Sequence, residues 1–129
     1  MGILDFNLDN VPEQTVADPG EVQLRIAKAE VKEKRDQSGF QICCTLEIEG
    51  HPNAAPIFHY LGLPAKADDE RQKNNKLRRV KEFCQALGVP TDNPNTDDWV
   101  GRSCWALIKV ETSEEYGTQN RVTRFIASQ

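Results

Sequence analysis

The sequence offers little material for a membrane span or an export signal. None of its 129 residues lies in an apolar run approaching the roughly 18 residues of a membrane-spanning helix. The first residues also lack the basic and apolar regions of a signal peptide. We therefore expect a cytoplasmic protein without a membrane partner.

Metal-binding residues are scarce. The chain has two histidines and four cysteines, and no two cysteines have the spacing of a zinc knuckle. Three of them, Cys44, Cys84 and Cys104, fall on apolar stripes, which is typical of small buried thiols in a reducing compartment. We predict no metal and no other cofactor.

Catalytic motifs are absent as well. The sequence contains no glycine-rich phosphate loop, no HExxH and no GxSxG. His59, beside Tyr60, is the one candidate acid or base on a predicted strand, and a lone strand histidine is more often structural. We predict that the protein is not an enzyme.

The charge is unevenly distributed along the chain. There are 16 basic and 20 acidic residues, a net charge of -4. Residues 1–24 carry five acidic residues and no basic one, whereas residues 71–81 carry six basic residues and no acidic one. An acidic protein can therefore still present a positively charged surface.

Alternating apolar residues predict five strands. The first begins at Gly20 and alternates as far as Ile26. Its apolar phase then slips by one residue and continues at Ala29 and Val31, which indicates a β-bulge. The other strands are expected at 40–48, 57–61, 103–111 and 120–127.

One long helix is predicted between the third and fourth strands. Asp68 or Asp69 can cap its start, and Gly88 supplies a stop after Leu87. Its apolar stripe begins at Leu77. After the helix, a short helical turn is expected to pack Trp99 against the core.

Five strands with a helix in this position are the element order of the OB-fold, a five-stranded Greek-key barrel. We therefore predict an all-β OB-fold domain with one helix over residues 20–129. An acidic N-terminal arm over residues 1–19 precedes it.

A surface for single-stranded nucleic acid needs cations along a groove and flat side chains for base stacking. Trp105 is expected to point outward, because Cys104 and Ala106 take the inward phase of their strand. Phe58 and Tyr60 share one face of the third strand, and the pattern leaves the direction of that face open. An outward Tyr60 is favoured, since its hydroxyl then needs no buried partner.

The last predicted strand also carries cations. Strict alternation places Arg121 and Phe125 on one side, and Val122 and Ile126 on the other. Arg124 then shares the side of Val122, away from Arg121, although both arginines are candidates for phosphate contacts.

Several short motifs together resemble a known family. They are Gly20-Glu21-Val22, Ser38-Gly39, Leu46-Glu47-Ile48, Ala86-Leu87-Gly88, Trp99-Val100-Gly101-Arg102, Tyr116-Gly117 and Asn120-Arg121-Val122. In order and spacing they are similar to the phage single-stranded DNA-binding proteins long catalogued as a domain of unknown function, over residues 20–127.

The resemblance implies an OB-fold that coats single-stranded DNA in phage replication or recombination, without catalysis and in the cytoplasm of the host cell. The acidic arm mixes acidic and apolar residues as the recruiting tails of functionally similar proteins do. We expect the arm to bind replication or recombination proteins or to mask the groove.

We therefore predict sequence-independent binding of single-stranded DNA. The residues predicted to contact phosphates or to stack on bases are Lys34, Arg35, Phe58, Tyr60, Trp105, Lys109, Tyr116, Arg121 and Arg124. The alternative is an OB-fold protein-interaction module that modulates a host or phage enzyme, which the acidic composition favours. The sequence leaves the formation of a homo-oligomer open.

Overall fold

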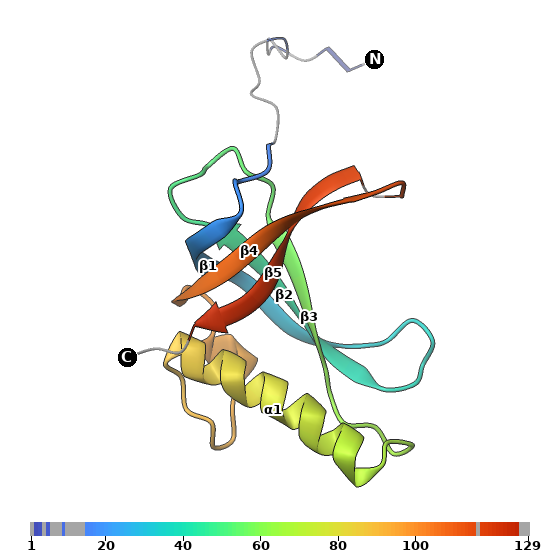
Figure 1. Cartoon of the computed structure of the whole chain (residues 1–129). Coiled ribbons are helices and arrows are strands. Elements are labelled where there is room, and N and C mark those ends of the chain that lie inside the picture. Colours follow the sequence, from blue (N-terminus) through green and yellow to red (C-terminus); the bar gives the residue numbers. More distant parts are fainter. Residues whose placement is uncertain (1, 4, 6–8, 10–14, 116, 127–129) are drawn as a thin grey trace.

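The computed structural model describes all residues except 1, 4, 6–8, 10–14, 116 and 127–129. Its elements are, in chain order, β1 (Gly20–Glu33), β2 (Phe40–Ile48), β3 (Ile57–Gly62), α1 (Glu70–Leu87), the short 3-10 helix η2 (Thr96–Asp98), β4 (Ser103–Ser113) and β5 (Gly117–Ile126). The strands form one antiparallel sheet in the order β3-β2-β1-β4-β5 (Figure 1). The chain is thus mostly β, with one long helix.

A bulge divides β1, the longest strand. Residues Gly20–Arg25 pair with β4 and residues Leu24–Glu33 pair with β2, and the register shifts between Ile26 and Lys28. A bulge increases the bend and twist of a strand. The predicted slip of phase is therefore confirmed, and it lets one strand belong to both halves of a strongly curved sheet.

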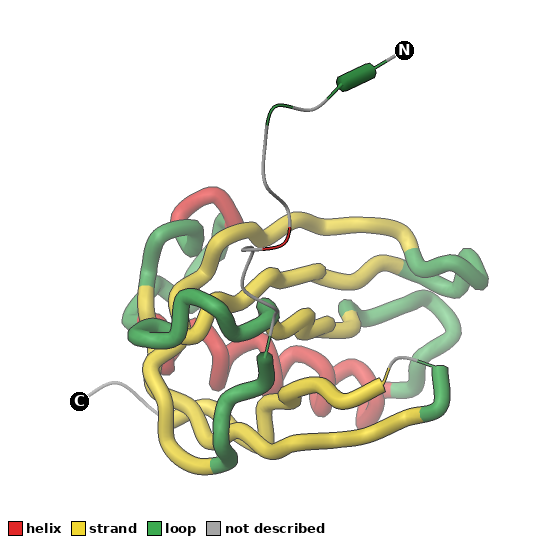
Figure 2. The backbone as a smooth tube through the Cα atoms, turned by 90° about the horizontal axis from the view of Figure 1, so that it is seen from above, coloured by secondary structure: helices red, strands yellow, loops and turns green. Residues whose placement is uncertain are grey.

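The edge strands β3 and β5 approach each other. Figure 2 shows the strands curving around a common interior, with α1 crossing behind them. Within the described residues no hydrogen-bonded ladder joins β3 to β5, so the sheet is open. Side chains bridge its edges instead. The Arg121 guanidinium donates to the Phe58 carbonyl at 3.4 Å, and the ring centroids of His59 and Phe125 lie 5.0 Å apart.

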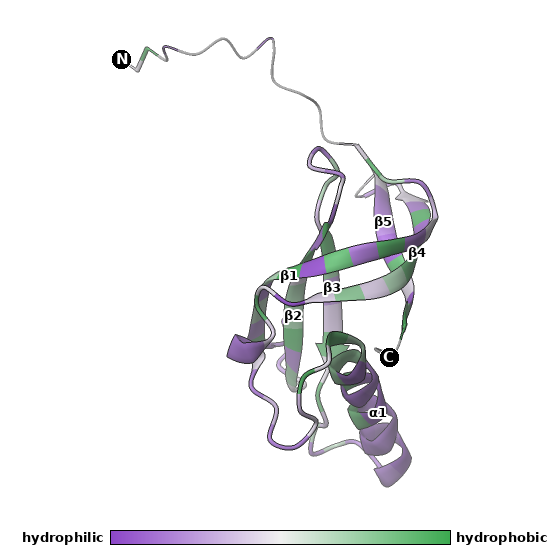
Figure 3. Cartoon of the chain, turned by 90° about the vertical axis from the view of Figure 1, so that its left-hand side faces the viewer, coloured by the Kyte–Doolittle hydropathy of each residue, from purple (hydrophilic) through white to green (hydrophobic). Residues whose placement is uncertain are grey.

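The interior of the curved sheet is the hydrophobic core. In β2, Ile42, Cys44 and Leu46 are buried on the predicted face, and bands of opposite hydropathy alternate along the strands in Figure 3. Trp99 follows η2 and is buried against Phe83 of α1, with ring centroids 5.4 Å apart. The predicted core position of Trp99 is confirmed.

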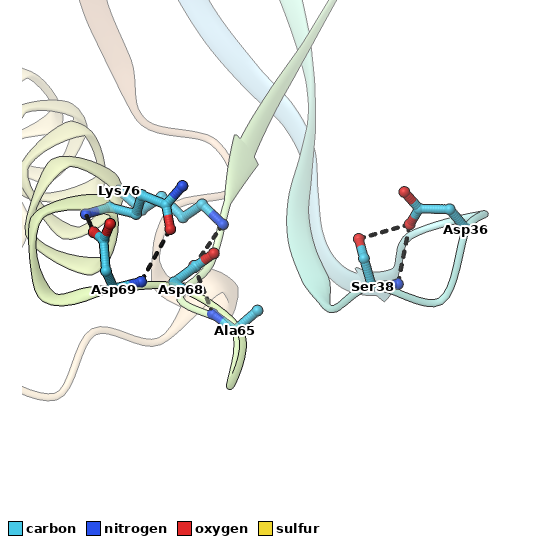
Figure 4. Close-up of polar contacts among 7 residues, drawn as sticks. Asp36, Ser38, Ala65, Asp68, Asp69 and Lys76 are labelled. Carbon is cyan, nitrogen blue, oxygen red and sulfur yellow. Dashed lines mark hydrogen bonds and ion pairs between the residues drawn. The ribbon is translucent and has the colours of Figure 1, made fainter.

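α1 begins and ends at the predicted signals. The Gln72 N–H donates to the Asp69 carboxylate at 2.8 Å, and the Gln72 side chain accepts from the Asp69 N–H at 2.9 Å (Figure 4). Gly88 ends the helix in the left-handed region, with φ of 72°. Among the described residues, no helix is long and apolar enough to cross a bilayer.

Only the second half of α1 is packed. Its buried residues begin at Val80, whereas Leu77 is 52% exposed. The predicted inward position of Leu77 is wrong, because the first half of α1 extends past the sheet (Figures 1 and 3). Val31, also expected in the core, is exposed where the β1–β2 hairpin projects from the sheet.

The segment before β1 is tied to β5 by one buried amide. Asn120 is 6% exposed; its Oδ1 accepts from the Ala17 N–H at 2.9 Å, and its Nδ2 donates to the Ala17 carbonyl at 2.9 Å and to the Lys109 carbonyl at 3.3 Å. Ala17 belongs to the core. Part of the sequence assigned to the arm is therefore packed against the folded domain.

Replacing Asn120 with alanine should lower the free energy of unfolding by about 1–3 kcal/mol, because a buried N–H and carbonyl lose their partners. Chemical denaturation measures this change. Gln119→Ala, one residue away on a more exposed position, is the control and should change stability by less than about 0.5 kcal/mol. Equal effects of the two substitutions would contradict the assigned role of Asn120.

Candidate nucleic-acid interface

Two aromatic side chains stand on the outer face of β3. Phe58 is 50% exposed and Tyr60 is 54% exposed, whereas Ile57 and Leu61 are buried. The sequence left the direction of this face open, and the structure places both rings outward. Exposed flat side chains of this kind are platforms on which bases can stack.

Two cations lie at the Phe58 end of β3. Arg121 of β5 pairs with Lys109 of β4 in the strand register and also donates to the Phe58 carbonyl. Glu111 forms ion pairs with both, at 3.4 Å from Arg121 and 3.2 Å from Lys109. These side chains are partly exposed, so each ion pair contributes about 0–1 kcal/mol and can be exchanged for a phosphate.

Two more cations cover the other end of β3. A Cβ at Gly62 would lie 3.7 Å from the Lys34 Nζ and 3.9 Å from the Lys76 Cε. Lys76 is paired with Asp68 at 2.6 Å (Figure 4). The hydrogen bond from Lys76 holds the pKa of the Asp68 carboxyl below its usual value. Asp68 therefore partly neutralises Lys76, with which it forms an ion pair, and the charge of Lys34 also lowers the pKa of this carboxyl.

The β1–β2 turn that carries Lys34 and Arg35 is ordered by Asp36. Its carboxylate accepts from the Ser38 N–H at 3.0 Å and from the Ser38 hydroxyl at 2.7 Å (Figure 4). The Lys34 N–H donates to the Gly39 carbonyl at 2.8 Å. Lys34 is thus held half-buried at the base of the turn beside β3, while Arg35 is exposed in the turn itself.

These groups form one row along β3, which we call the β3 stripe. Its members are Lys109, Arg121, Phe58, Tyr60 and Lys34. Cations lie at both ends and aromatic rings at the centre. This combination suits an unpaired polynucleotide, because phosphates need cations and bases need flat surfaces.

A cleft of about 390 Å³ opens beside Tyr60, between β3, β5 and α1. Arg124 of β5 and Arg79 of α1 both line it, together with one acidic residue, Glu82. The cleft therefore adds two guanidinium groups to the side of the β3 stripe that faces the helix.

A second bulge brings Arg124 to this cleft. The register of β4 with β5 shifts between Leu107 and Ile108, so that Arg124 lies opposite the outward-facing Leu107. The same shift turns Phe125 inward, where its ring centroid lies 4.7 Å from that of Phe83. The strict alternation predicted for β5 is therefore wrong at its C-terminal end, where Arg124 is exposed.

His59 is half-buried, lines the same cleft and packs against aromatic side chains. Its ring lies between Phe125, at 5.0 Å, and Phe83, at 6.1 Å between centroids. Burial lowers the pKa of the imidazole, and the nearby charge of Arg121 lowers it further. The neutral ring therefore packs among aromatic side chains.

Trp105 is outward, as expected, and 49% exposed, but its surroundings are acidic. It lies opposite Gln23 of β1 and lines a hollow with Glu21 and Glu49. Along β4 it is four residues from Lys109, about 13 Å. The structure therefore does not bring Trp105 together with the β3 stripe. The carboxylates around Trp105 would also repel the phosphates of a bound strand.

Two cations near the β3 stripe, Lys76 and Arg79, were not assigned to the site from the sequence. Both belong to the basic run over residues 71–81, which the sequence shows. The sequence does not show that this run lies next to β3, because that depends on the fold. Tyr116, a predicted stacking residue, lies outside the described residues.

In the part of the chain that the structure describes, no cluster of three His, Cys, Asp or Glu side chains is arranged to hold an ion. All four cysteines are free thiols. Burial raises the pKa of Cys44 and of Cys104 to about 12, whereas Cys43 is half-buried on the outer face of β2.

One protein family matches nearly the whole chain. It is described as "Protein of unknown function (DUF669)", and the match covers residues 4–123. No curated protein matches the chain.

The lowered pKa of His59 predicts a pH-dependent stability. Between this lowered pKa and the unfolded value of about 6.5, the unfolded chain binds more protons than the folded one, so stability falls as the pH drops from 7 towards 5. Denaturation at several pH values measures this slope. His59→Phe should flatten it between pH 7 and 5, and His51→Gln, at an exposed histidine, should leave it in place.

Proposed function

We propose that this chain, which belongs to the DUF669 family of proteins of unknown function, binds single-stranded DNA without catalysing a reaction. The β3 stripe is the observation that carries the proposal. In line with the resemblance of its motifs to phage proteins, the protein would coat unpaired strands during phage replication or recombination in the host cytoplasm.

Each part of the β3 stripe has a role in this function. Phe58 and Tyr60 lie two residues apart on one face, about 7 Å, so each ring can take its own base. Lys109 and Arg121 at one end, and Lys34 at the other, would hold phosphates on either side of the stacked bases. Because stacking and phosphate contacts read no base edges, binding would tolerate any sequence.

We further propose that the curved sheet is an OB-fold barrel. The bulged β1 pairs with β2 through one half and with β4 through the other, and β5 reaches β3 through side chains. These features match a five-stranded, partly open Greek-key barrel. The OB-fold binding surface crosses strands 2 and 3, and the β3 stripe lies along that third strand.

The net charge of -4 does not oppose this function. A local cationic row attracts phosphates within a Debye length of about 8 Å at physiological salt, and charges farther away are largely screened. Among the described residues, Glu111 forms ion pairs with two cations of the stripe, and the charge of Lys34 acts on the Asp68 carboxylate. The ion pairs of Glu111 with Lys109 and Arg121 would open when a phosphate binds.

Replacing Phe58 or Tyr60 with alanine should weaken binding to oligo-dT by about 1–3 kcal/mol for each stacked base lost. Fluorescence anisotropy of a labelled oligonucleotide measures the affinity. Phe40→Ala is the matched control, because Phe40 is equally exposed but belongs to the opposite face of the sheet.

Wild-type protein that fails to bind oligo-dT at low salt would refute the DNA-binding proposal. Equal retention of single-stranded and double-stranded DNA in a gel shift would refute the role of base stacking. Unchanged affinity in both aromatic variants would move the binding surface away from β3. The alternative function, a protein-interaction module with the same fold, would then be favoured.

Cys43 reports whether DNA also crosses β2. It lies opposite Tyr60 in the strand register and is the one cysteine in the described residues that is not buried. Oligo-dT should slow alkylation of Cys43 several-fold in native protein, as measured by mass spectrometry. The buried Cys44 and Cys104 should react only after unfolding. Alkylation at an unchanged rate would show that the DNA strand does not cover β2 at Cys43.

A further inference from the structure

The exposed face of α1 presents a cationic surface that the β3 stripe does not use. Leu77, 52% exposed, has Lys73 and Lys81 as its neighbours one turn away on either side. Arg71 and Arg78 add two further exposed cations to this helix. None of these four cations forms an ion pair with another described residue. We call Lys73, Leu77 and Lys81 the helix stripe.

The hollow beside Trp105 has the complementary character. Its volume is about 440 Å³, and its wall combines the exposed Trp105 indole and the half-buried Val22 with the carboxylates of Glu21 and Glu49. The Ser103 hydroxyl donates to the Glu49 carboxylate at 2.7 Å, which fixes that group at the rim. Large exposed apolar residues bordered by charge are typical of protein interfaces.

The two surfaces cannot meet within one molecule. The hollow includes the start of the β2–β3 connection, and Figure 1 shows that connection and the first half of α1 at opposite ends of the molecule. We infer that the helix stripe of one copy docks in the Trp105 hollow of a second copy. Leu77 would contact the indole, while Lys73 and Lys81 would pair with Glu21 and Glu49.

Such a contact is heterologous, because each copy offers a different surface to each neighbour. A heterologous contact that does not close into a ring adds copies in a row. The β3 stripes of successive copies would then be available to one long strand. The contact uses residues outside the β3 stripe, so it does not depend on DNA binding.

The test measures self-association without DNA. In sedimentation velocity at low salt, the mean mass of the wild type should rise with concentration, and high salt should weaken this rise. Lys73→Glu with Lys81→Glu should weaken association about tenfold or more, and Glu21→Lys with Glu49→Lys should do the same. An equimolar mixture of the two double variants should associate again, because each then offers the charge that the other lacks.

Two controls make the result specific. Lys28→Glu with Lys32→Glu changes the net charge equally at exposed positions of β1, and should leave association unchanged. Trp105 emission should shift to shorter wavelength with rising concentration, and Trp105→Phe should remove that shift.

Three outcomes would overturn the inference. One is a wild type that remains monomeric at all concentrations and salt conditions. Another is a mixture of the charge-reversed variants that does not associate. The third is association that is lost on deletion of residues 1–14 but insensitive to Glu21 and Glu49, which would make the acidic arm the occupant of the helix stripe.

Discussion

The bulge in β1 is the constraint on which the other features depend. β1 pairs with β4 through its first residues and with β2 from Leu24 onward, and the register shift between Ile26 and Lys28 bends the strand just after the residues that both neighbours share. The sheet consequently curves until its edges meet through the Arg121 guanidinium and the Phe58 carbonyl. Without that curvature, β3 and β5 would lie at opposite ends of a flat sheet. Phe58 and Tyr60 would then have no cations from β5 and β4 beside them.

The second bulge, between β4 and β5, changes which side chains of β5 face the core and which face the solvent. It exchanges the faces of two neighbouring residues, so that Phe125 joins Phe83 in the core and Arg124 reaches the cleft beside Tyr60. The aromatic cluster also explains the lowered pKa of His59, since burial disfavours the charged imidazolium. The same bulge therefore determines both the aromatic packing and the position of a surface cation where β3 and β5 approach each other.

The sequence predicted the strands, the helix and the first bulge, because each depends on a local pattern of apolar residues or on a cap such as Asp69. It also predicted that Trp105 would point outward. It could not predict which exposed residues become neighbours, because that depends on curvature and register between distant strands. Trp105 and Lys109 share a face of β4, yet only the fold shows carboxylates around one and Phe58 near the other. Leu77 was misassigned because its spacing is that of a core stripe, whereas its burial depends on where the sheet ends.

The acidic and basic residues of the chain are concentrated on different surfaces of the molecule. Cations gather on the first half of α1, whereas Glu21 and Glu49 border the hollow at the other end of the molecule (Figure 1). A uniformly cationic protein would bind phosphates but repel its own copies, and a uniformly acidic one would repel both phosphates and its own copies. A chain with opposite charges at its two ends can attract both a polyanion and a further copy. The net charge of -4 is then the sum of two local surfaces, and it predicts neither by itself.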